Sequence, residues 1–170
     1  MALALAAGCA GLAACGQEAA NAPAETQGAE IAVTNARMVL NAVSGNPAAI
    51  YFDIANNTDR PITLRGASVS NAESAELHEY MEWDRQMVMG EMAPLPLQPG
   101  ESVQFEPGGR HVMAMGVSPE LQAGGTTEVT LQLLGGGTYS FTAQVLAAGS
   151  IDESAPPLPP PIGAAAETEG

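Results

Sequence analysis

The sequence predicts an all-β domain, an antiparallel sandwich or barrel, in the middle of the chain. Short segments rich in β-branched and aromatic residues follow one another from about residue 31 to residue 146. Clusters of Gly, Pro, Asn and Asp separate these segments. No segment keeps the apolar period of an amphipathic helix, so the pattern favours short strands joined by turns.

The expected strands follow one another in chain order, and turn-forming residues separate them. Their ranges are 48–56, 62–69, 102–107, 128–134 and 138–146. The expected turns are 56–61, 98–101, 107–109 and 135–137, where Asn, Asp, Pro and Gly cluster. Regular spacing of such turns is typical of β-sandwiches and barrels.

The β domain is expected to span residues 29–147 of the 170-residue chain, which is enough sequence for one apolar core. Residues 1–15 carry no charge and are rich in Ala and Leu, as in an export signal. Residues 16–28 are small and polar and predict a flexible tether. Residues 148–170 are rich in Pro and Ala with little to bury, and they predict a disordered tail.

Composition and motifs exclude two classes of function. The chain has 5 Arg, no Lys and 19 acidic residues, and its formal net charge is −14. Phosphate backbones repel such a chain, so we expect no nucleic-acid partner. The sequence also lacks a Gly-rich phosphate loop, a serine elbow and a cysteine nucleophile in its folded part, so we expect no enzyme.

A short motif at the end of the apolar leader indicates attachment to a membrane. Leu12-Ala13-Ala14-Cys15 resembles the lipobox of bacterial lipoproteins, in which the cysteine is lipidated and becomes the new N-terminus. Cys9 fits less well, because no branched residue stands three places before it. The resemblance implies a periplasmic protein anchored through Cys15, and an ordinary cleaved signal is the alternative.

Methionine and histidine are concentrated in one window of the sequence. Both histidines and six of the eight methionines lie between residues 78 and 115. They are His78, Met81, Met87, Met89, Met92, His111, Met113 and Met115. Because methionine is usually a sparse gap-filler in cores, this window is either an unusual Met-rich core or a soft-metal site.

The spacing of these residues favours the metal site. Alternate residues of a strand share a face, so His111, Met113 and Met115 point the same way if they lie on a strand. Met87 and Met89 share a face by the same rule. Imidazole and thioether together suit Cu(I), because a thioether is a soft, neutral ligand. Zinc would take four His, Cys or carboxylate ligands, and both cysteines lie in the leader.

The same residues resemble the signature of the periplasmic copper chaperones called PCuAC. That signature is a His and a Met separated by ten residues, then twenty-one residues, then His-x-Met, and the same gaps separate His78, Met89, His111 and Met113. The surrounding segments AELHEYM, PLPLQPGESVQFEPGG and RHVMAMG are also similar to the family. The resemblance extends from about residue 31 to residue 146.

The resemblance implies a cupredoxin-like Greek-key β-sandwich or barrel that binds one Cu(I). The implied metal ligands are His78, Met89, His111 and Met113. It further implies delivery of the ion to a respiratory oxidase, at the copper centre of cytochrome c oxidase, or exchange with another carrier such as a Sco-type protein. Two alternatives stay open: a lipoprotein whose Met-rich patch binds a protein without metal, and a copper store in which further methionines bind more ions.

The residues around these four have separate expectations. Met115 continues the face of the strand and is expected to pack beside the ligands. Trp83, the sole tryptophan, is expected in a loop between His78 and Met89, where it covers the copper or docks a partner. The residues expected to be structural are Met81, Met87 and Met92.

Overall fold

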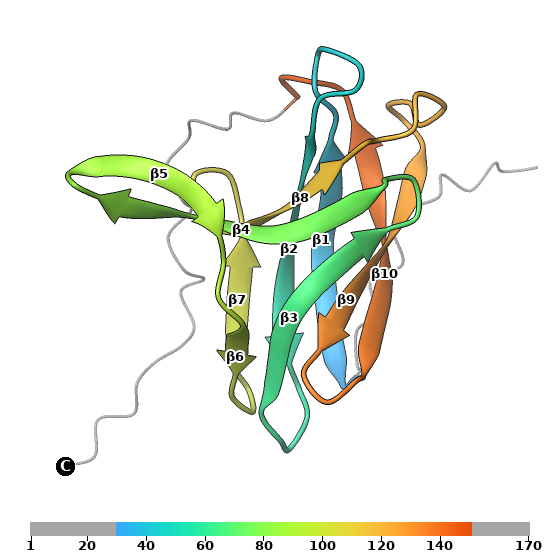
Figure 1. The fold of residues 1–170 in the computed structure, drawn as a ribbon. Coiled ribbons are helices and arrows are strands. Elements are labelled where there is room, and N and C mark those ends of the chain that lie inside the picture. Colours follow the sequence, from blue (N-terminus) through green and yellow to red (C-terminus); the bar gives the residue numbers. More distant parts are fainter. Residues whose placement is uncertain (1–29, 151–170) are drawn as a thin grey trace, which may run out of the picture.

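A computed structural model describes residues 30–150, and this part of the chain consists of ten β-strands and no helix. The strands are β1 (Ile31–Val39), β2 (Ala48–Asn56), β3 (Ile62–Val69), β4 (Ser74–Trp83), β5 (Gln86–Glu91), β6 (Leu95–Leu97), β7 (Ser102–Phe105), β8 (His111–Met115), β9 (Thr126–Leu133) and β10 (Thr138–Leu146). Most of them form a barrel-like body, from which one hairpin projects (Figure 1). The all-β prediction is confirmed.

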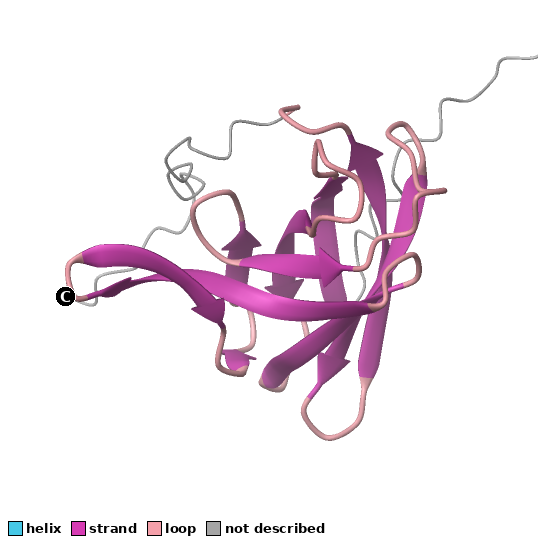
Figure 2. Cartoon of the chain, turned by 45° about the horizontal axis from the view of Figure 1, so that its top comes forward, coloured by secondary structure: helices cyan, strands magenta, loops and turns pink. Residues whose placement is uncertain are grey.

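All ten strands belong to one hydrogen-bonded sheet that curls on itself (Figure 2). Its order is β5-β4-β8-β2-β1-β10-β9-β3-β6, and β7 pairs with β2 beside this path. β1 and β10 run parallel, whereas the pairs formed by β4 are antiparallel. Strands β3 and β4 are consecutive in the chain but lie in different parts of this order, so the chain crosses over between them. This crossover places β4 beside β8.

Three of the predicted strands have the predicted bounds, namely β2, β3 and β10. β7 ends at Phe105, before the predicted end, because Pro107 cannot donate a hydrogen bond to a neighbouring strand. β9 begins at Thr126, earlier than predicted, because its pairing with β10 continues to Gln144. Composition places the middle of a strand well, while pairing decides where the strand ends.

The core is centred on Phe52 of β2, which is fully buried. Its ring stacks on that of Phe105 in β7, with 4.4 Å between ring centroids and an interplanar angle of 11°. The Phe141 ring lies 5.0 Å from Phe52 at 54°. Successive residues of a strand point to opposite faces, so Tyr51 faces away from Phe52, and its ring centroid lies 6.2 Å from that of His111 in β8.

Strands β4 and β5 form the hairpin that projects from the body (Figure 1). The residue pattern predicts a loop around Trp83, and this prediction is wrong, because β4 continues to Trp83, which pairs with Gln86. Asp84 and Arg85 alone form the turn, with positive φ angles of 50° and 61°, as a type I′ turn requires. Arginine is not a residue that predicts positive φ, and this hides the hairpin in the sequence.

Residues 1–29 and 151–170 lie outside the described part of the chain. The predicted export signal, the tether, Cys15 and most of the predicted tail fall there and stay predictions. Within residues 30–150, no helical segment has the length and apolarity needed to cross a membrane.

Candidate metal centre

Three neighbouring strands, β5, β4 and β8, carry the residues that the sequence predicts as metal ligands. β4 pairs with β8 so that His78 lies directly opposite His111. On its other side β4 pairs with β5, where Tyr80 lies opposite Met89. Directly opposite residues share a face of the sheet, as do alternate residues of one strand. The residues brought to one face are therefore His78, Met89, His111 and Met113.

His78 has the central position in this group. Met113 lies opposite Glu76, two residues before His78. Met89 lies opposite Tyr80, two residues after it. Each methionine is thus a diagonal neighbour of His78, and diagonal neighbours in a sheet are about 7–8 Å apart, within reach of long side chains. Two imidazoles and two thioethers can therefore converge beside His78.

The two imidazoles lie close together, and the protein covers most of their surface. Their ring centroids are 5.9 Å apart with an interplanar angle of 63°. His111 is only 3% exposed, and the side chain of His78 is 15% exposed. Met89, in contrast, is 44% exposed. The candidate centre is therefore covered at its imidazoles and open at Met89, while Met113 is partly buried.

Each imidazole has a ring nitrogen within hydrogen-bond distance of an oxygen. Nδ1 of His111 lies 3.2 Å from the carbonyl oxygen of Gly109. Nε2 of His78 lies 3.1 Å from Oε2 of Glu76. Nδ1 of His78 is buried and has no hydrogen-bond partner in the part of the chain that the structure describes. Because buried polar atoms are normally paired, this orphaned nitrogen fits a position kept for a metal ion.

Two tyrosines surround His111, and neither is predicted for the site. The ring centroids of Tyr80 and Tyr51 lie 5.8 Å and 6.2 Å from that of His111. The guanidinium of Arg37 lies 5.6 Å from the centroid of the Tyr51 ring. Strand alternation from His78 is a signal that could have indicated Tyr80. Tyr51 has no such signal in the sequence, because the pairing of β2 with β8 brings it there.

Trp83 and Met115, which the sequence also associates with the site, do not lie beside His78 as the predicted ligands do. Trp83 lies on the opposite face of β4 from His78, next to the hairpin turn, and is 73% exposed. Of the two expectations for Trp83, covering the copper does not fit this position, and docking a partner stays a prediction. Met115 shares the face of His111 and is partly buried. It lies opposite Ser74, which precedes Glu76 by two residues on β4, so it is farther from His78 than Met113 is.

The remaining methionines divide between the core and the surface of the hairpin. Met92 is 7% exposed and belongs to the core, as predicted. Met87, which is expected to be structural, is 64% exposed on β5. Met81 is 37% exposed and lies opposite Val88, on the other face of the hairpin from Met87.

Carboxylates share the face of the candidate centre. Glu91 lies opposite His78, and Glu76 and Glu82 are alternate residues on either side of it along β4. A surface with this charge attracts cations. Glu79 lies on the other face, where its Oε2 is 3.6 Å from Nε of Arg110. Within residues 30–150, no three side chains of His, Cys, Asp or Glu come together as a metal-binding group.

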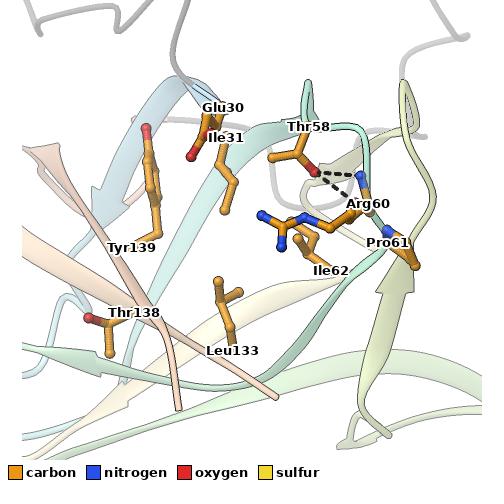
Figure 3. A pocket seen from close by; sticks show the side chains of 9 residues that line it. All are labelled: Glu30, Ile31, Thr58, Arg60, Pro61, Ile62, Leu133, Thr138 and Tyr139. Atoms are coloured by element: carbon orange, nitrogen blue, oxygen red, sulfur yellow. Dashed lines mark hydrogen bonds between the residues drawn. The ribbon is translucent and has the colours of Figure 1, made fainter. Parts of the chain in front are cut away.

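A groove of about 520 Å³ lies at the start of β1 (Figure 3). It combines the apolar side chains of Ile31 and Tyr139 with the charged side chains of Glu30 and Arg60. The hydroxyl of Thr58 donates a hydrogen bond of 2.7 Å to the carbonyl oxygen of Arg60 on its rim. None of the residues that line this groove is a histidine or a methionine, so it is separate from the candidate metal centre.

The fold and the site define an all-β domain with a partly open group of two imidazoles and two thioethers. The chain belongs to the family described as "Putative lipoprotein LpqE-like", whose model matches residues 31–145. It is 30% identical over 94 residues to the putative lipoprotein Lxx21020 of Leifsonia xyli subsp. xyli, a match that covers 55% of this chain and 57% of that relative. The chain thus matches little more than half the length of this relative.

Solved structures with a similar fold include a PCuAC domain and the protein DR1885. The copper-bound PCuAC domain from PmoF2 has a TM-score of 0.57 at 24% identity, over 70% of this chain and 94% of that chain. Apo-DR1885 from Deinococcus radiodurans has a TM-score of 0.53 at 27% identity, over 86% of this chain and 97% of that chain. The CuI form of DR1885 has a TM-score of 0.50 at 28% identity, over 65% and 74% of the two chains. The predicted cupredoxin-like fold and the resemblance to PCuAC domains are confirmed.

Proposed function

We propose that this protein is a periplasmic copper chaperone that binds one Cu(I) on the face shared by β5, β4 and β8. The observation that carries the proposal is the register that places His111 opposite His78 and both Met89 and Met113 diagonal to it. Two thioethers favour a soft monovalent ion over zinc or calcium. The similarity to DR1885, whose structure is known with CuI, supports the same ion.

The uneven exposure of the ligands suits a protein that gives its ion away. His111 is buried against β2, and His78 lies between two paired strands. Met89 is 44% exposed on β5, which is an edge strand of the sheet. A ligand of an acceptor protein can therefore replace Met89 first, while the imidazoles still hold the ion. The acceptors we propose are copper-binding subunits of a respiratory oxidase, such as cytochrome c oxidase, or a Sco-type carrier.

Anaerobic titration with Cu(I) in competition with a chromogenic chelator tests the binding. We expect one ion per chain, followed by loss of that ion to a purified acceptor domain on mixing. A protein that binds no Cu(I) would instead be a metal-free interaction module. A stoichiometry well above one would favour a copper store, because additional methionines would then act as ligands.

Methionine substitutions test the ligand assignment on β8. Replacing Met113 with leucine keeps the size of the side chain but removes the sulfur, so Met113→Leu is expected to weaken Cu(I) binding. The apo protein should lose less than about 1.5 kcal/mol of unfolding free energy, as volume-conserving swaps usually do. Met115→Leu is the matched control and should leave Cu(I) affinity nearly unchanged, since Met115 lies farther from His78 along the sheet. If Met115→Leu lost the ion and Met113→Leu kept it, the assignment would be wrong by one strand period.

We also propose that the domain is held at the membrane by a lipid on Cys15, in keeping with a family described as putative lipoproteins. Replacing Cys15 with serine is expected to move the protein from the membrane fraction to the soluble fraction, because the acyl chains supply the membrane affinity. Cys9→Ser is the control and should leave the protein at the membrane. Mass spectrometry of the mature N-terminus gives a direct reading, and an unmodified chain that begins at another residue would contradict the anchor.

A further inference from the structure

The two imidazoles approach hydrogen-bonding oxygens through different ring nitrogens, Nε2 in His78 and Nδ1 in His111. We propose that His78 binds Cu(I) through Nδ1 and His111 through Nε2, and that Glu76 is the positioning residue that keeps Nδ1 of His78 available. This inference rests on the proposed copper binding. It goes beyond it by assigning the ligating atoms and a role to a carboxylate that is not itself a ligand.

The hydrogen bond of His78 determines which of its nitrogens carries the lone pair. Nε2 of His78 lies 3.1 Å from Oε2 of Glu76. An ionised carboxylate only accepts hydrogen bonds, so the proton of a neutral imidazole must be on Nε2 and its lone pair on Nδ1. Nδ1 is the buried nitrogen that has no hydrogen-bond partner among residues 30–150. The nitrogen of His78 that carries the lone pair is therefore the same nitrogen that has no hydrogen-bond partner within the described residues, namely Nδ1.

The hydrogen bond of His111 gives the opposite result. Its Nδ1 lies 3.2 Å from the carbonyl oxygen of Gly109. A carbonyl oxygen also only accepts, so the proton of His111 is on Nδ1 and the lone pair is on Nε2. A backbone group holds this tautomer, whereas the tautomer of His78 depends on a side chain. A single side-chain substitution can therefore remove the hydrogen bond that orients His78, whereas the hydrogen bond of His111 is made to the backbone.

Glu76 is well placed for this role among the acidic residues of the face. Glu91 lies opposite His78 and Glu82 lies farther along β4, but the carboxylate within hydrogen-bond distance of His78 is that of Glu76. Glu76 also lies opposite Met113, so it is a neighbour of both His78 and one of the candidate thioether ligands. A carboxylate bonded to the outer nitrogen of a ligating histidine fixes its orientation and strengthens it as a ligand.

The ring nitrogens can be observed directly in protein labelled with ¹⁵N-histidine, by long-range ¹H–¹⁵N correlation spectra. In the apo protein at a pH where both rings are neutral, we expect the proton of His78 on Nε2 and that of His111 on Nδ1. On addition of Cu(I), the large ¹⁵N shifts should occur at Nδ1 of His78 and Nε2 of His111. A proton on Nδ1 of His78 in the apo protein, or a copper-induced shift at its Nε2, would overturn the proposal.

Three variants test the role of Glu76. Glu76→Ala removes the acceptor and is expected to lower Cu(I) affinity by about 10-fold or more, in the range found for loss of groups that orient ligands. Its copper-induced ¹⁵N shift should no longer be confined to Nδ1 of His78. Glu76→Gln keeps an oxygen that accepts from Nε2 and should restore both the affinity and the Nδ1 shift. Glu82→Ala removes the same charge from the same face of β4 and should match the wild type.

The outcomes separate this inference from the proposed function. If Glu76→Gln and Glu82→Ala both weakened binding as much as Glu76→Ala, negative charge alone would be responsible, and the positioning role would be rejected. If the wild-type protein bound no Cu(I), the proposed function would fall. The spectra of the apo protein would still decide whether Glu76 and Gly109 hold the two tautomers.

Discussion

Replacement of His111 with alanine is expected to abolish stoichiometric Cu(I) binding and to lower the affinity by more than about 100-fold, beyond the usual cost of losing a group that only orients a ligand. His111 is 3% exposed and lies directly opposite His78, so its imidazole is the covered half of the candidate centre. Without it, a single imidazole and two thioethers remain. Chelator competition with the purified variant measures the loss.

A second substitution separates loss of the ligand from loss of packing. His111→Phe keeps an aromatic ring beside Tyr51 and Tyr80 but has no nitrogen to donate to a metal ion. Both variants should fail to bind Cu(I), while thermal melts of the apo proteins show what fraction is folded. Binding of one ion by a folded His111→Phe protein with unchanged affinity would contradict the assigned ligand set.

Truncation of Phe52 is expected to have the largest effect on stability. Phe52 is fully buried and packs against the rings of Phe105 and Phe141. Phe52→Ala removes most of a buried ring and leaves a cavity, which typically costs about 3–5 kcal/mol of unfolding free energy. Since domains are stable by about 5–15 kcal/mol, much of the variant is expected to unfold at moderate denaturant concentrations.

Equilibrium unfolding in urea measures this loss, and Leu134→Ala provides the control. Leu134 is 68% exposed, and surface substitutions usually change stability by less than about 0.5 kcal/mol. Because Tyr51 and His111 are positioned by the strand that carries Phe52, the Phe52→Ala protein should also bind less Cu(I), in proportion to its unfolded fraction. Equal midpoints for Phe52→Ala and Leu134→Ala would show that the aromatic stack is not the centre of the core.

The layout of the candidate centre is compatible with the proposed exchange of an ion from a stable body. His111 and Met113 belong to β8, which pairs with the central strand β2. Met89 belongs to an edge strand in a hairpin that projects from the body. A change in the hairpin can therefore alter access to the candidate centre with little effect on the core around Phe52.

The sequence by itself determined the fold class, the approximate ranges of five of the ten strands that the structure describes, and the candidate ligands. Alternation of residue types marks each strand locally, and turn residues mark the gaps, so β2, β3 and β10 could be predicted to the residue. The four candidate ligands could be named because the PCuAC signature that they resemble is a spacing along the chain, from His78 to Met113, which needs no knowledge of how the strands pair.

The tertiary structure alone decided which side chains surround those ligands. The continuation of β4 as a strand as far as Trp83 puts Trp83 on the opposite face from His78, and the pairing of β4 with β8 places Tyr80 beside His111. The pairing of β2 with β8 brought in Tyr51 from a distant part of the chain. The physical reason is that side chains alternate along a strand, so a shift of one residue in the pairing exchanges the two faces of the sheet. That register is set by core packing and by the positive-φ turn at Arg85, and the local sequence predicts neither.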